Sequence, residues 1–251
     1  TIKLLKNTEI DTPLMTDKTI TITSDESAAA PYTLKRAAAF QPINTSEFLM
    51  TFVYKGDYGT PTFDADVTLY LENIIVDGGS EDGIVAHDAL IQLGYANLVL
   101  GEGASLQNNN DAGGRAGAVS SFGGNVTVGK GSQIVNNEAC LGAGIFADGG
   151  TVKITGGKIE GNTATTDSRG NFTVRINEQK CGAGIFMWSR DDLPDTVVEL
   201  ESGSISNNIA GNYGGGVYVK ANTGKTATFR MSGGSVKGNE ARYGGGVYIL
   251  S

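Results

Sequence analysis

The feature that most constrains the fold is a unit that recurs five times between residue 98 and the end of the chain. Each unit opens with alternating apolar and polar residues, passes through a turn that usually contains Gly, and reaches an Asn followed two residues later by Ala. It closes on a small residue, a β-branched residue and usually an aromatic. The opening stretches are Leu98–Leu100, Val126–Val128, Val152–Ile154, Val198–Leu200 and Phe229–Met231. The Asn and Ala positions are Asn110/Ala112, Asn137/Ala139, Asn162/Ala164, Asn208/Ala210 and Asn239/Ala241. The closing β-branched residues are Val119, Ile145, Ile185, Val217 and Val247.

The period and the pattern of the unit predict an all-β solenoid. The closing residues lie 26, 40, 32 and 30 residues apart, a range that suits one coil with extra residues in loops. Helical repeats of similar length are excluded, because the apolar residues alternate with period two and Gly and β-branched residues fill the unit. We therefore predict a right-handed, single-stranded parallel β-helix with irregular N-terminal coils.

Stacking of the coils predicts which residues face inward. In the opening strands the apolar residues face the core, and the residue between them faces solvent. The outward residues are Thr127, Lys153, Glu199 and Arg230. Lys153 and Glu199, then Glu199 and Arg230, become neighbours of opposite charge on adjacent strands, about 4.8 Å apart. The repeated Asn suits a corner in the left-handed conformation, with an amide that hydrogen-bonds along the stack.

The N-terminal third is less regular. Thr19–Thr23 and Val67–Leu71 predict strands, and residues 71–79 predict a strand, a corner, a second strand and a turn, so that two to four imperfect coils fit here. Residues 28–59 are expected to include a long excursion over the end of the coils, because an exposed solenoid end is an open sheet edge.

These patterns predict one domain over residues 1–251, with irregular coils and a cap in residues 1–66 and regular coils in residues 67–251. The sequence has no initiator Met and no signal peptide, and residues 244–251 complete a repeat motif and then stop. We expect a segment of a longer protein that continues beyond both ends.

The repeat is familiar. The Asn-x-Ala … Gly-Gly-Gly-Val-Tyr unit resembles the Gly-Gly-Ala-Ile repeats of the polymorphic outer-membrane protein family, and the related β-helix repeats of large adhesin-like surface proteins. The phrase Leu-x-Leu-x-Asn-Ile-x-Val-Asp-Gly at residues 69–78 is similar to one found in the pectin-lyase-like superfamily. The resemblance covers about residues 60–251 and implies an extracellular place on a bacterial cell surface. It says little about activity, because this fold hosts lyases, hydrolases, tailspikes and adhesins. The Phe of the family's Phe-x-x-Asn motif is replaced by Ile in Ile134–Asn137, Ile159–Asn162 and Ile205–Asn208.

Charge and hydropathy limit the partners. The formal net charge is −8 and the calculated pI is about 4.7, which opposes binding to a phosphate backbone, so we expect no nucleic-acid partner. No apolar run approaches the roughly 20 residues that span a bilayer, so we expect no membrane insertion by this segment. We expect a monomer.

Catalytic and metal signatures are weak. Glycoside hydrolysis requires two facing carboxylates, but the aligned outward positions hold one acid, Glu199, among Thr127, Lys153 and Arg230. His87 is the only histidine, and a structural or exposed role is the simpler interpretation. Residues 77–82 read as an acidic turn, with a Ca²⁺ site as the alternative. We expect no catalytic residues, no metal and no cofactor.

An aromatic column is the first candidate binding feature. Phe146, Phe186, Tyr218 and Tyr248 each follow an inward Val or Ile and should face away from the core. An exposed ladder would stack on sugars or anchor a protein, and Tyr218 and Tyr248 enter the candidate ligand set on that basis. The alternative is a ladder that stabilises itself by stacking and is covered by loops.

The enlarged third coil is the second candidate. It inserts residues 165–180 and 188–195, and rigid scaffolds commonly carry binding residues on such loops. Trp and Arg are favoured at binding hot spots, although neutral insertion is the alternative. The candidate ligand-binding residues here are Arg169, Phe172, Arg175, Trp188, Arg190, Asp191 and Asp192. Asp191 and Asp192 also fit a solvated loop, or a catalytic or metal site.

The two cysteines, Cys140 and Cys181, lie at almost the same place in consecutive coils. Stacking brings equivalent Cα atoms within disulfide range, so we predict that the two sulfurs are close and consider a disulfide. The one-residue offset relative to Ile145 and Ile185 opposes it, because neighbouring residues on a strand face opposite ways.

The sequence therefore predicts a surface adhesin or display module that binds host or environmental glycans or proteins through loops and one face of a solenoid. A polysaccharide-active lyase or hydrolase on the same fold, and a structural stalk without a ligand, remain the alternatives.

Overall fold

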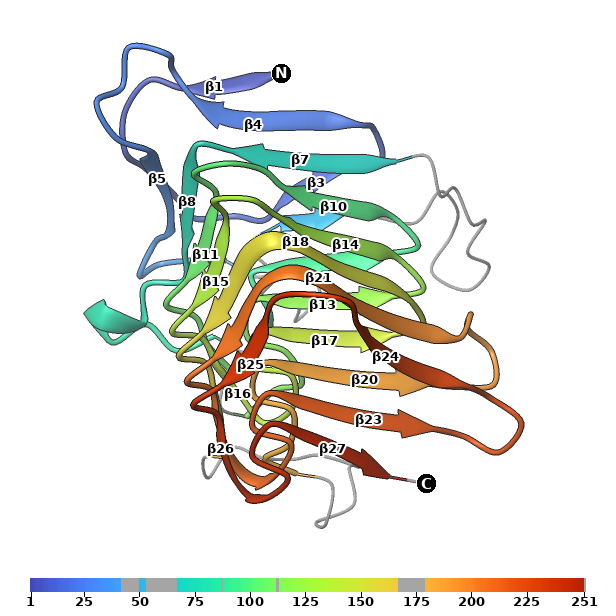
Figure 1. Ribbon diagram of the computed structural model, residues 1–251. Coiled ribbons are helices and arrows are strands. Elements are labelled where there is room, and N and C mark those ends of the chain that lie inside the picture. Colours follow the sequence, from blue (N-terminus) through green and yellow to red (C-terminus); the bar gives the residue numbers. More distant parts are fainter. Residues whose placement is uncertain (42–49, 53–66, 87, 112, 167–178, 251) are drawn as a thin grey trace.

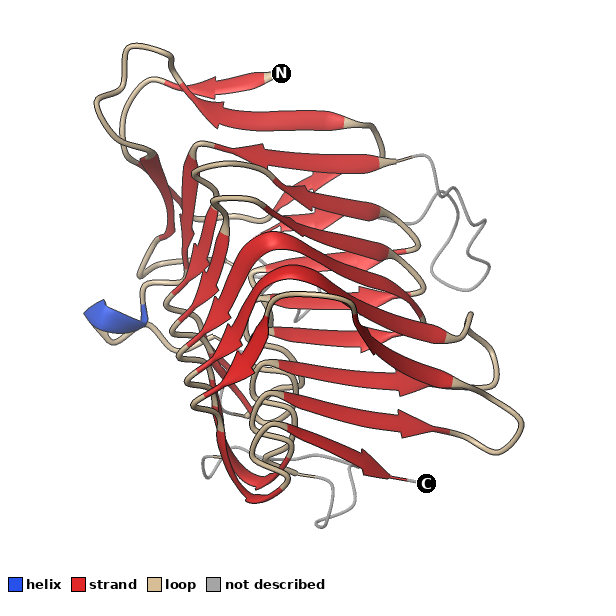
Figure 2. Ribbon diagram, in the orientation of Figure 1, coloured by secondary structure: helices blue, strands red, loops and turns tan. Residues whose placement is uncertain are grey.

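The computed structural model describes residues 1–41, 50–52, 67–86, 88–111, 113–166 and 179–250. The described residues form an all-β fold in which every strand pairing is parallel and successive coils stack on one another (Figure 1). The one helix among them is the single-turn η1, Ser80–Asp82 (Figure 2). The stacked parallel coils confirm the predicted solenoid architecture.

The largest sheet has two arms joined by two long strands. Gly156 and Gly203 have φ of 114° and 91° where β18 and β21 bend between the arms. The joining strands are β18 (Gly150–Glu160) and β21 (Thr196–Ser206). The first arm continues with β1 (Ile2–Leu4), β4 (Ile20–Ser24), β7 (Thr68–Glu72), β10 (Asn97–Leu100), β14 (Asn125–Gly129) and β24 (Ala227–Met231). The second arm continues with β2 (Thr8–Ile10), β5 (Tyr32–Arg36), β8 (Ile74–Asp77), β11 (Ser105–Gln107), β15 (Gln133–Val135) and β25 (Ser235–Lys237).

Two further sheets complete the coils, and the smaller of them begins only in the coil of β10. A five-stranded sheet forms the next corner and contains β12 (Asn110–Asp111), β16 (Glu138–Ala139), β19 (Thr163–Ala164), β22 (Ile209–Tyr213) and β26 (Glu240–Tyr243). An eight-stranded sheet contains β3 (Leu14–Thr16), β6 (Met50–Phe52), β9 (Ile91–Gly94), β13 (Val119–Phe122), β17 (Ile145–Asp148), β20 (Ile185–Ser189), β23 (Val217–Ala221) and β27 (Val247–Leu250).

The register follows the predicted alternation. Leu98, Val126, Val152 and Val198 stand opposite one another in adjacent coils and are all buried. In the last coil Phe229 is half-buried, and Met231, predicted to face inward, is exposed, since β24 pairs with β21 alone among the described strands. The central interior is therefore a continuous apolar core.

The predicted charge neighbours are confirmed. Lys153 stands opposite Glu199, and Glu199 stands opposite Arg230. Arg230 Nη1 lies 2.5 Å from Glu199 Oε1, while Lys153 Nζ turns to Glu201 Oε1 at 2.8 Å. Exposed pairs of this kind add little stability.

A ladder of asparagine side chains runs along one corner of the stack. Each Nδ2 donates to the Oδ1 of the next coil: Asn137 to Asn162 at 3.0 Å, Asn162 to Asn208 at 3.0 Å, and Asn208 to Asn239 at 2.9 Å. At the other end Arg36 Nη1 donates to Asn109 Oδ1 at 2.6 Å. These bonds satisfy amides that burial would otherwise penalise.

Two details of the predicted ladder are wrong. In the first unit the ladder residue is Asn109, because Asn110 pairs with Glu138 one position further on. The left-handed residue is the one before the ladder, with φ of 56° at Asn136 and 55° at Asn207. That turn aims the following Asn side chain along the stack, and Asn tolerates the conformation better than most residues.

Three coils precede the first coil with a corner strand, as the irregular N-terminal pattern predicted. Within residues 28–59, the described strands belong to the coils and not to the predicted excursion. Strand β5 pairs with β2 and β8, and β6 pairs with β3 and β9, so both belong to the stack. Residues 42–49 and 53–66 lie outside the described residues.

The aromatic column faces away from the central core but is covered. Phe146, Phe186 and Tyr218 are at most 1% exposed, and their rings stack with centroids 5.3 and 4.7 Å apart. They share a second apolar cluster with Cys140, Leu141 and Cys181. An exposed ladder is therefore wrong for these three rings, and the covered ladder is correct.

The cover is the chain just before β17, β20 and β23. Gly142, Gly182 and Gly214 have φ between 54° and 62°, which turns this segment back over the rings. A Cβ on Gly182 would lie 2.6 Å from the Ile185 carbonyl oxygen, so only Gly fits this close approach.

Cys140 and Cys181 are both buried, and the structure holds no disulfide between them, unlike the bond considered from the sequence. Cys181 stands opposite Leu141 rather than Cys140, so the offset of one residue decides the register. Burial raises the pKa of the Cys140 thiol, and Cys181 Sγ donates to the Gln179 carbonyl oxygen at 3.2 Å.

Candidate functional site

Trp188 lies near the end of β20, on the same face of the strand as Phe186. Ile185 and Met187 point into the central core, so the alternate residues Phe186 and Trp188 belong to the second apolar cluster. Phe186 is fully covered, whereas Trp188 is half-buried. Its strand neighbours are Asp148 on β17 and Lys220 on β23. The cover over the aromatic stack therefore stops short of Trp188.

The indole of Trp188 is held at its edge and flanked by cations. Its Nε1 donates to Asn222 Oδ1 at 2.9 Å. Lys220 Nζ lies 4.2 Å from the ring centroid, and Arg190 Cζ lies 5.2 Å from it. Both distances are within the range of a favourable cation–π interaction. The arrangement fixes an amphipathic ring with two positive charges beside it.

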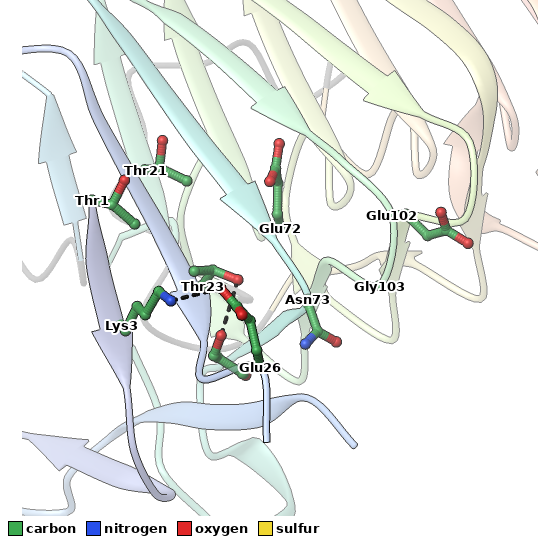
Figure 3. A pocket seen from close by; sticks show the side chains of 10 residues that line it. Thr1, Lys3, Thr21, Thr23, Glu26, Glu72, Asn73, Glu102 and Gly103 are labelled. Carbon is green, nitrogen blue, oxygen red and sulfur yellow. Dashed lines mark hydrogen bonds and ion pairs between the residues drawn. The ribbon is translucent and has the colours of Figure 1, made fainter. Parts of the chain in front are cut away.

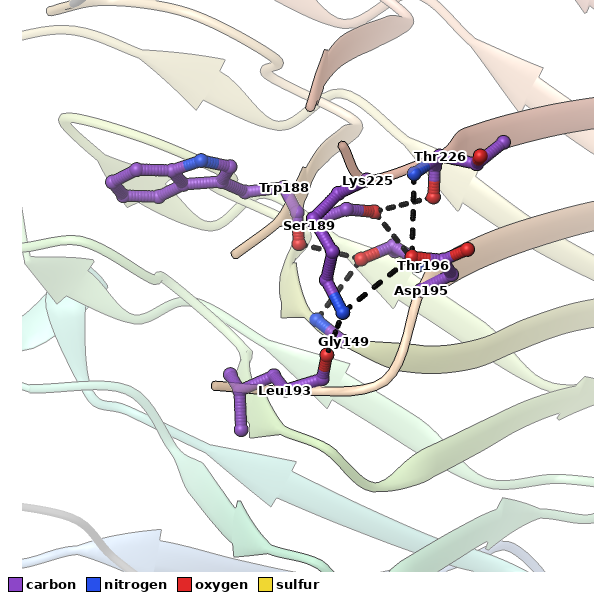
Figure 4. Close-up of polar contacts among 8 residues, drawn as sticks. All are labelled: Gly149, Trp188, Ser189, Leu193, Asp195, Thr196, Lys225 and Thr226. Carbon is purple, nitrogen blue, oxygen red and sulfur yellow. Dashed lines mark hydrogen bonds and ion pairs between the residues drawn. The ribbon is translucent and has the colours of Figure 1, made fainter. Parts of the chain in front are cut away.

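A polar network pins the two ends of the loop that follows Trp188 (Figure 4). Gly149 N donates to Trp188 O at 3.1 Å and to Thr196 Oγ1 at 2.9 Å, and Thr196 Oγ1 donates to Trp188 O at 2.5 Å. Thr196 N donates to Ser189 Oγ at 2.8 Å. The residues at which the loop leaves β20 and enters β21 are thus bonded to each other and to the turn after β17.

The next coil also holds this loop. Ser189 Oγ donates to Thr226 O at 2.8 Å, and Lys225 Nζ donates to Leu193 O at 2.7 Å. Asp195 Oδ1 accepts from Thr226 N at 3.2 Å (Figure 4). The loop is therefore bonded to the coil that follows it, which favours a fixed position for Trp188 and Arg190.

Asp148 is a buried carboxylate beside this loop. Its side chain has no exposed surface, and Arg190 Nη2 contacts its Oδ2 as an ion pair. Neither carboxylate oxygen has a well-directed hydrogen bond among the described residues. Burial raises the pKa of Asp148, and the guanidinium of Arg190 only partly offsets this.

The structure brings only some of the predicted ligand residues together. Trp188 and Arg190 meet at this site, with Asp191 and Asp192 exposed on the loop beside them. Tyr218 is 1% exposed and cannot offer its ring to a ligand, which corrects its place in the candidate set. Tyr248 is half-buried in the last coil, stacked at 5.7 Å on Tyr218. Arg169, Phe172 and Arg175 lie outside the described residues.

Three residues of the site were missed from the sequence: Asp148, Lys220 and Asn222. Asp148 and Lys220 are each three residues after a closing β-branched residue, as Trp188 is. Alignment of the repeats therefore predicts that Asp148 and Lys220 lie beside Trp188. The aromatic column predicted from the sequence concerned only the residue that directly follows the β-branched one.

An open groove lies over the N-terminal coils, apart from the Trp188 site (Figure 3). Its lining is polar and includes the carboxylates of Glu26, Glu72 and Glu102. Glu26 is paired with Lys3 at 2.8 Å, whereas Glu72 and Glu102 form no ion pair within the described part of the chain. None of the residues that line this groove was a candidate site residue in the sequence analysis.

Within the described ranges, no three His, Cys, Asp or Glu side chains gather where a metal ion would be held. Asp77 serves the turn: its Oδ1 accepts from Gly79 N at 2.7 Å, and its Oδ2 accepts from Gln107 Nε2 at 2.9 Å and Asn108 Nδ2 at 3.0 Å. His87 lies outside the described residues. None of the described helical structure is long and apolar enough to cross a membrane.

Comparison of the chain with protein-family models, with curated proteins and with solved structures finds no match.

Proposed function

We propose that this chain is a display or adhesin module of a bacterial cell surface, built as a right-handed parallel β-helix of the pectin-lyase-like kind. It binds a glycan or protein of the host or environment at the Trp188 site. The observation that carries the proposal is the half-buried indole of Trp188, held by Asn222 and flanked by Arg190 and Lys220.

Physical reasons favour this site over the rest of the surface. An indole supplies a large apolar face with little conformational entropy to lose on binding. Arg190 and Lys220 add donors for the hydroxyl, carboxylate or sulfate groups of a ligand. The loop anchors at Ser189, Thr196 and Lys225 reduce the ordering cost of binding.

Arrays of glycans and of extracellular-matrix proteins test the proposal, with wild type, Trp188→Ala and Tyr70→Ala compared side by side. Tyr70 is an exposed aromatic on β7 and serves as the matched control. We expect Trp188→Ala to lose at least tenfold in affinity, about 1.4 kcal/mol, and Tyr70→Ala to bind as wild type does. Equal binding by all three proteins would remove the site from the proposal.

A polysaccharide-active enzyme is the second candidate, and the groove of Figure 3 favours it. Glu72 and Glu102, which form no ion pair among the described residues, bring two carboxylates into one polar groove, and hydrolysis of a glycosidic bond requires a pair of carboxylates. Incubation with acidic and neutral polysaccharides tests this. Turnover lost in Glu72→Gln and Glu102→Gln would establish the enzyme, whereas silence in both the array and the turnover assay would leave a structural stalk.

A further inference from the structure

One arginine contacts both a buried acid and the half-buried ring of the candidate site. Arg190 Nη2 is paired with Asp148 Oδ2, and Arg190 Cζ lies 5.2 Å from the Trp188 ring centroid. Asp148 is fully buried, while the Arg190 side chain is 36% exposed. The charge state of Asp148 therefore acts on a cation that reaches the surface at Trp188.

The charged and titratable groups around Asp148 come from three segments of the chain. Arg190 and Asp192 lie on the loop after β20, Arg115 precedes β13, and Tyr95 follows β9. The strand partners of Asp148 are Phe122 on β13 and Trp188 on β20, which carry no charge. Burial favours the neutral acid and outweighs Arg190 and Arg115, so the pKa of Asp148 is raised.

We infer that Asp148 is a positioning residue of the Trp188 site and acts through Arg190 as an acid-sensitive latch. When the carboxylate of Asp148 takes up one proton from solvent, the ion pair is lost and Arg190 keeps its own charge. That charge is then no longer paired with Asp148, and the middle of the loop loses one of its tethers. The surface at Trp188 becomes more cationic as the pH falls.

The consequence for ligands rests on the proposed function; the release of Arg190 does not. An anionic ligand, such as a glycan with carboxylate or sulfate groups, gains a free guanidinium at low pH. Its affinity should therefore rise on acidification, in contrast to the loss expected where a ligand depends on a carboxylate of the protein.

Quenching of tryptophan fluorescence tests the latch without any ligand, because Trp188 is the only tryptophan of the chain. Iodide is an anion, so its quenching constant follows the local positive charge, and neutral acrylamide follows access alone. For wild type we expect the ratio of iodide to acrylamide quenching to rise as the pH falls. The midpoint should lie above the ordinary aspartate value of about 3.9.

Two variants and a control decide the outcome. Asp148→Asn should show the high ratio at every pH with no step, and Arg190→Gln should show a low ratio with a much smaller rise. Asp17→Asn changes an exposed aspartate elsewhere and should titrate as wild type does. Circular dichroism establishes that each variant is folded, and Arg190→Gln still tests the latch if Asp148→Asn is not. An unchanged wild-type step in either variant overturns the inference.

The two proposals fail separately. A normal step together with binding that ignores Trp188→Ala would leave the latch and remove the adhesin site. An absent step in wild type together with binding lost in Trp188→Ala would leave the site and remove the latch.

Discussion

Phe186 and Trp188 lie two residues apart on the same face of β20, yet their surroundings differ. Phe186 is 1% exposed and stacked between Phe146 and Tyr218, whereas Trp188 is half-buried. The segments that turn back at Gly142, Gly182 and Gly214 cover Phe186 and the rings stacked on it. Trp188 is not covered in this way and instead contacts Asn222 and Lys220. Aromatic residues on the outer face of a strand therefore become part of a core where a chain segment folds back over them. Where no segment does so, they are left as a candidate binding surface.

The largest effect should come from removing the covered ring. Phe186→Ala deletes a fully buried side chain from a stacked column, and such deletions cost about 3–5 kcal/mol. Trp188→Ala should cost much less, since part of that ring is already in water. Chemical denaturation measures the free energy of unfolding of both variants. Equal losses would show that the two rings do not differ in burial as described.

A smaller effect should come from lifting the cover itself. Gly182→Ala forces a Cβ to within 2.6 Å of the Ile185 carbonyl oxygen at φ of 62°, and strain of this kind costs about 1–3 kcal/mol. Gly224→Ala is the matched control, because its φ is 81° but no atom lies within 4 Å of the added Cβ. The difference between their unfolding free energies isolates the close approach; no difference would mean that the segment does not press on the strand.

The pH dependence of stability should separate Asp148 from ordinary surface acids. Because its folded-state pKa is raised, the native protein holds a proton that the unfolded chain releases between the ordinary value and the raised one. Stability therefore falls as the pH rises through this window, and the full penalty is present above it. Relative to Asp148→Asn, wild type should gain stability on acidification from about pH 7 towards the ordinary aspartate pKa of about 3.9. A relative loss of stability over that range would contradict the raised pKa.

The smallest effect concerns the cysteines in the cover. Cys140 and Cys181 are buried and not joined in a disulfide. Burial raises the pKa of the Cys140 thiol, so its reactive thiolate is scarce. Thiol counting should find almost no reaction in the native protein and two thiols after unfolding without reductant. Detection of no thiols after unfolding would show a disulfide and a different register at Leu141.

The sequence was sufficient for the coils and the register, because period-two alternation and a β-branched residue once per coil leave few other ways to bury the apolar side chains. It was insufficient where two segments of one coil meet. The outward direction of Tyr218 follows from alternation, but its burial depends on Gly182 and Gly214 folding the chain back, which alternation does not describe. Asp148 was missed for a related reason: its partner Arg190 lies 42 positions away in an enlarged coil.

Binding of ligands at Trp188 is best tested by the fluorescence of this residue. The protein is titrated with a glycan or protein that the array identifies. The chain has no other tryptophan, so the signal comes from this site alone. We expect saturable changes in emission that give the same Kd as an independent binding assay. A ligand that binds tightly while the emission of Trp188 stays constant would contradict the account.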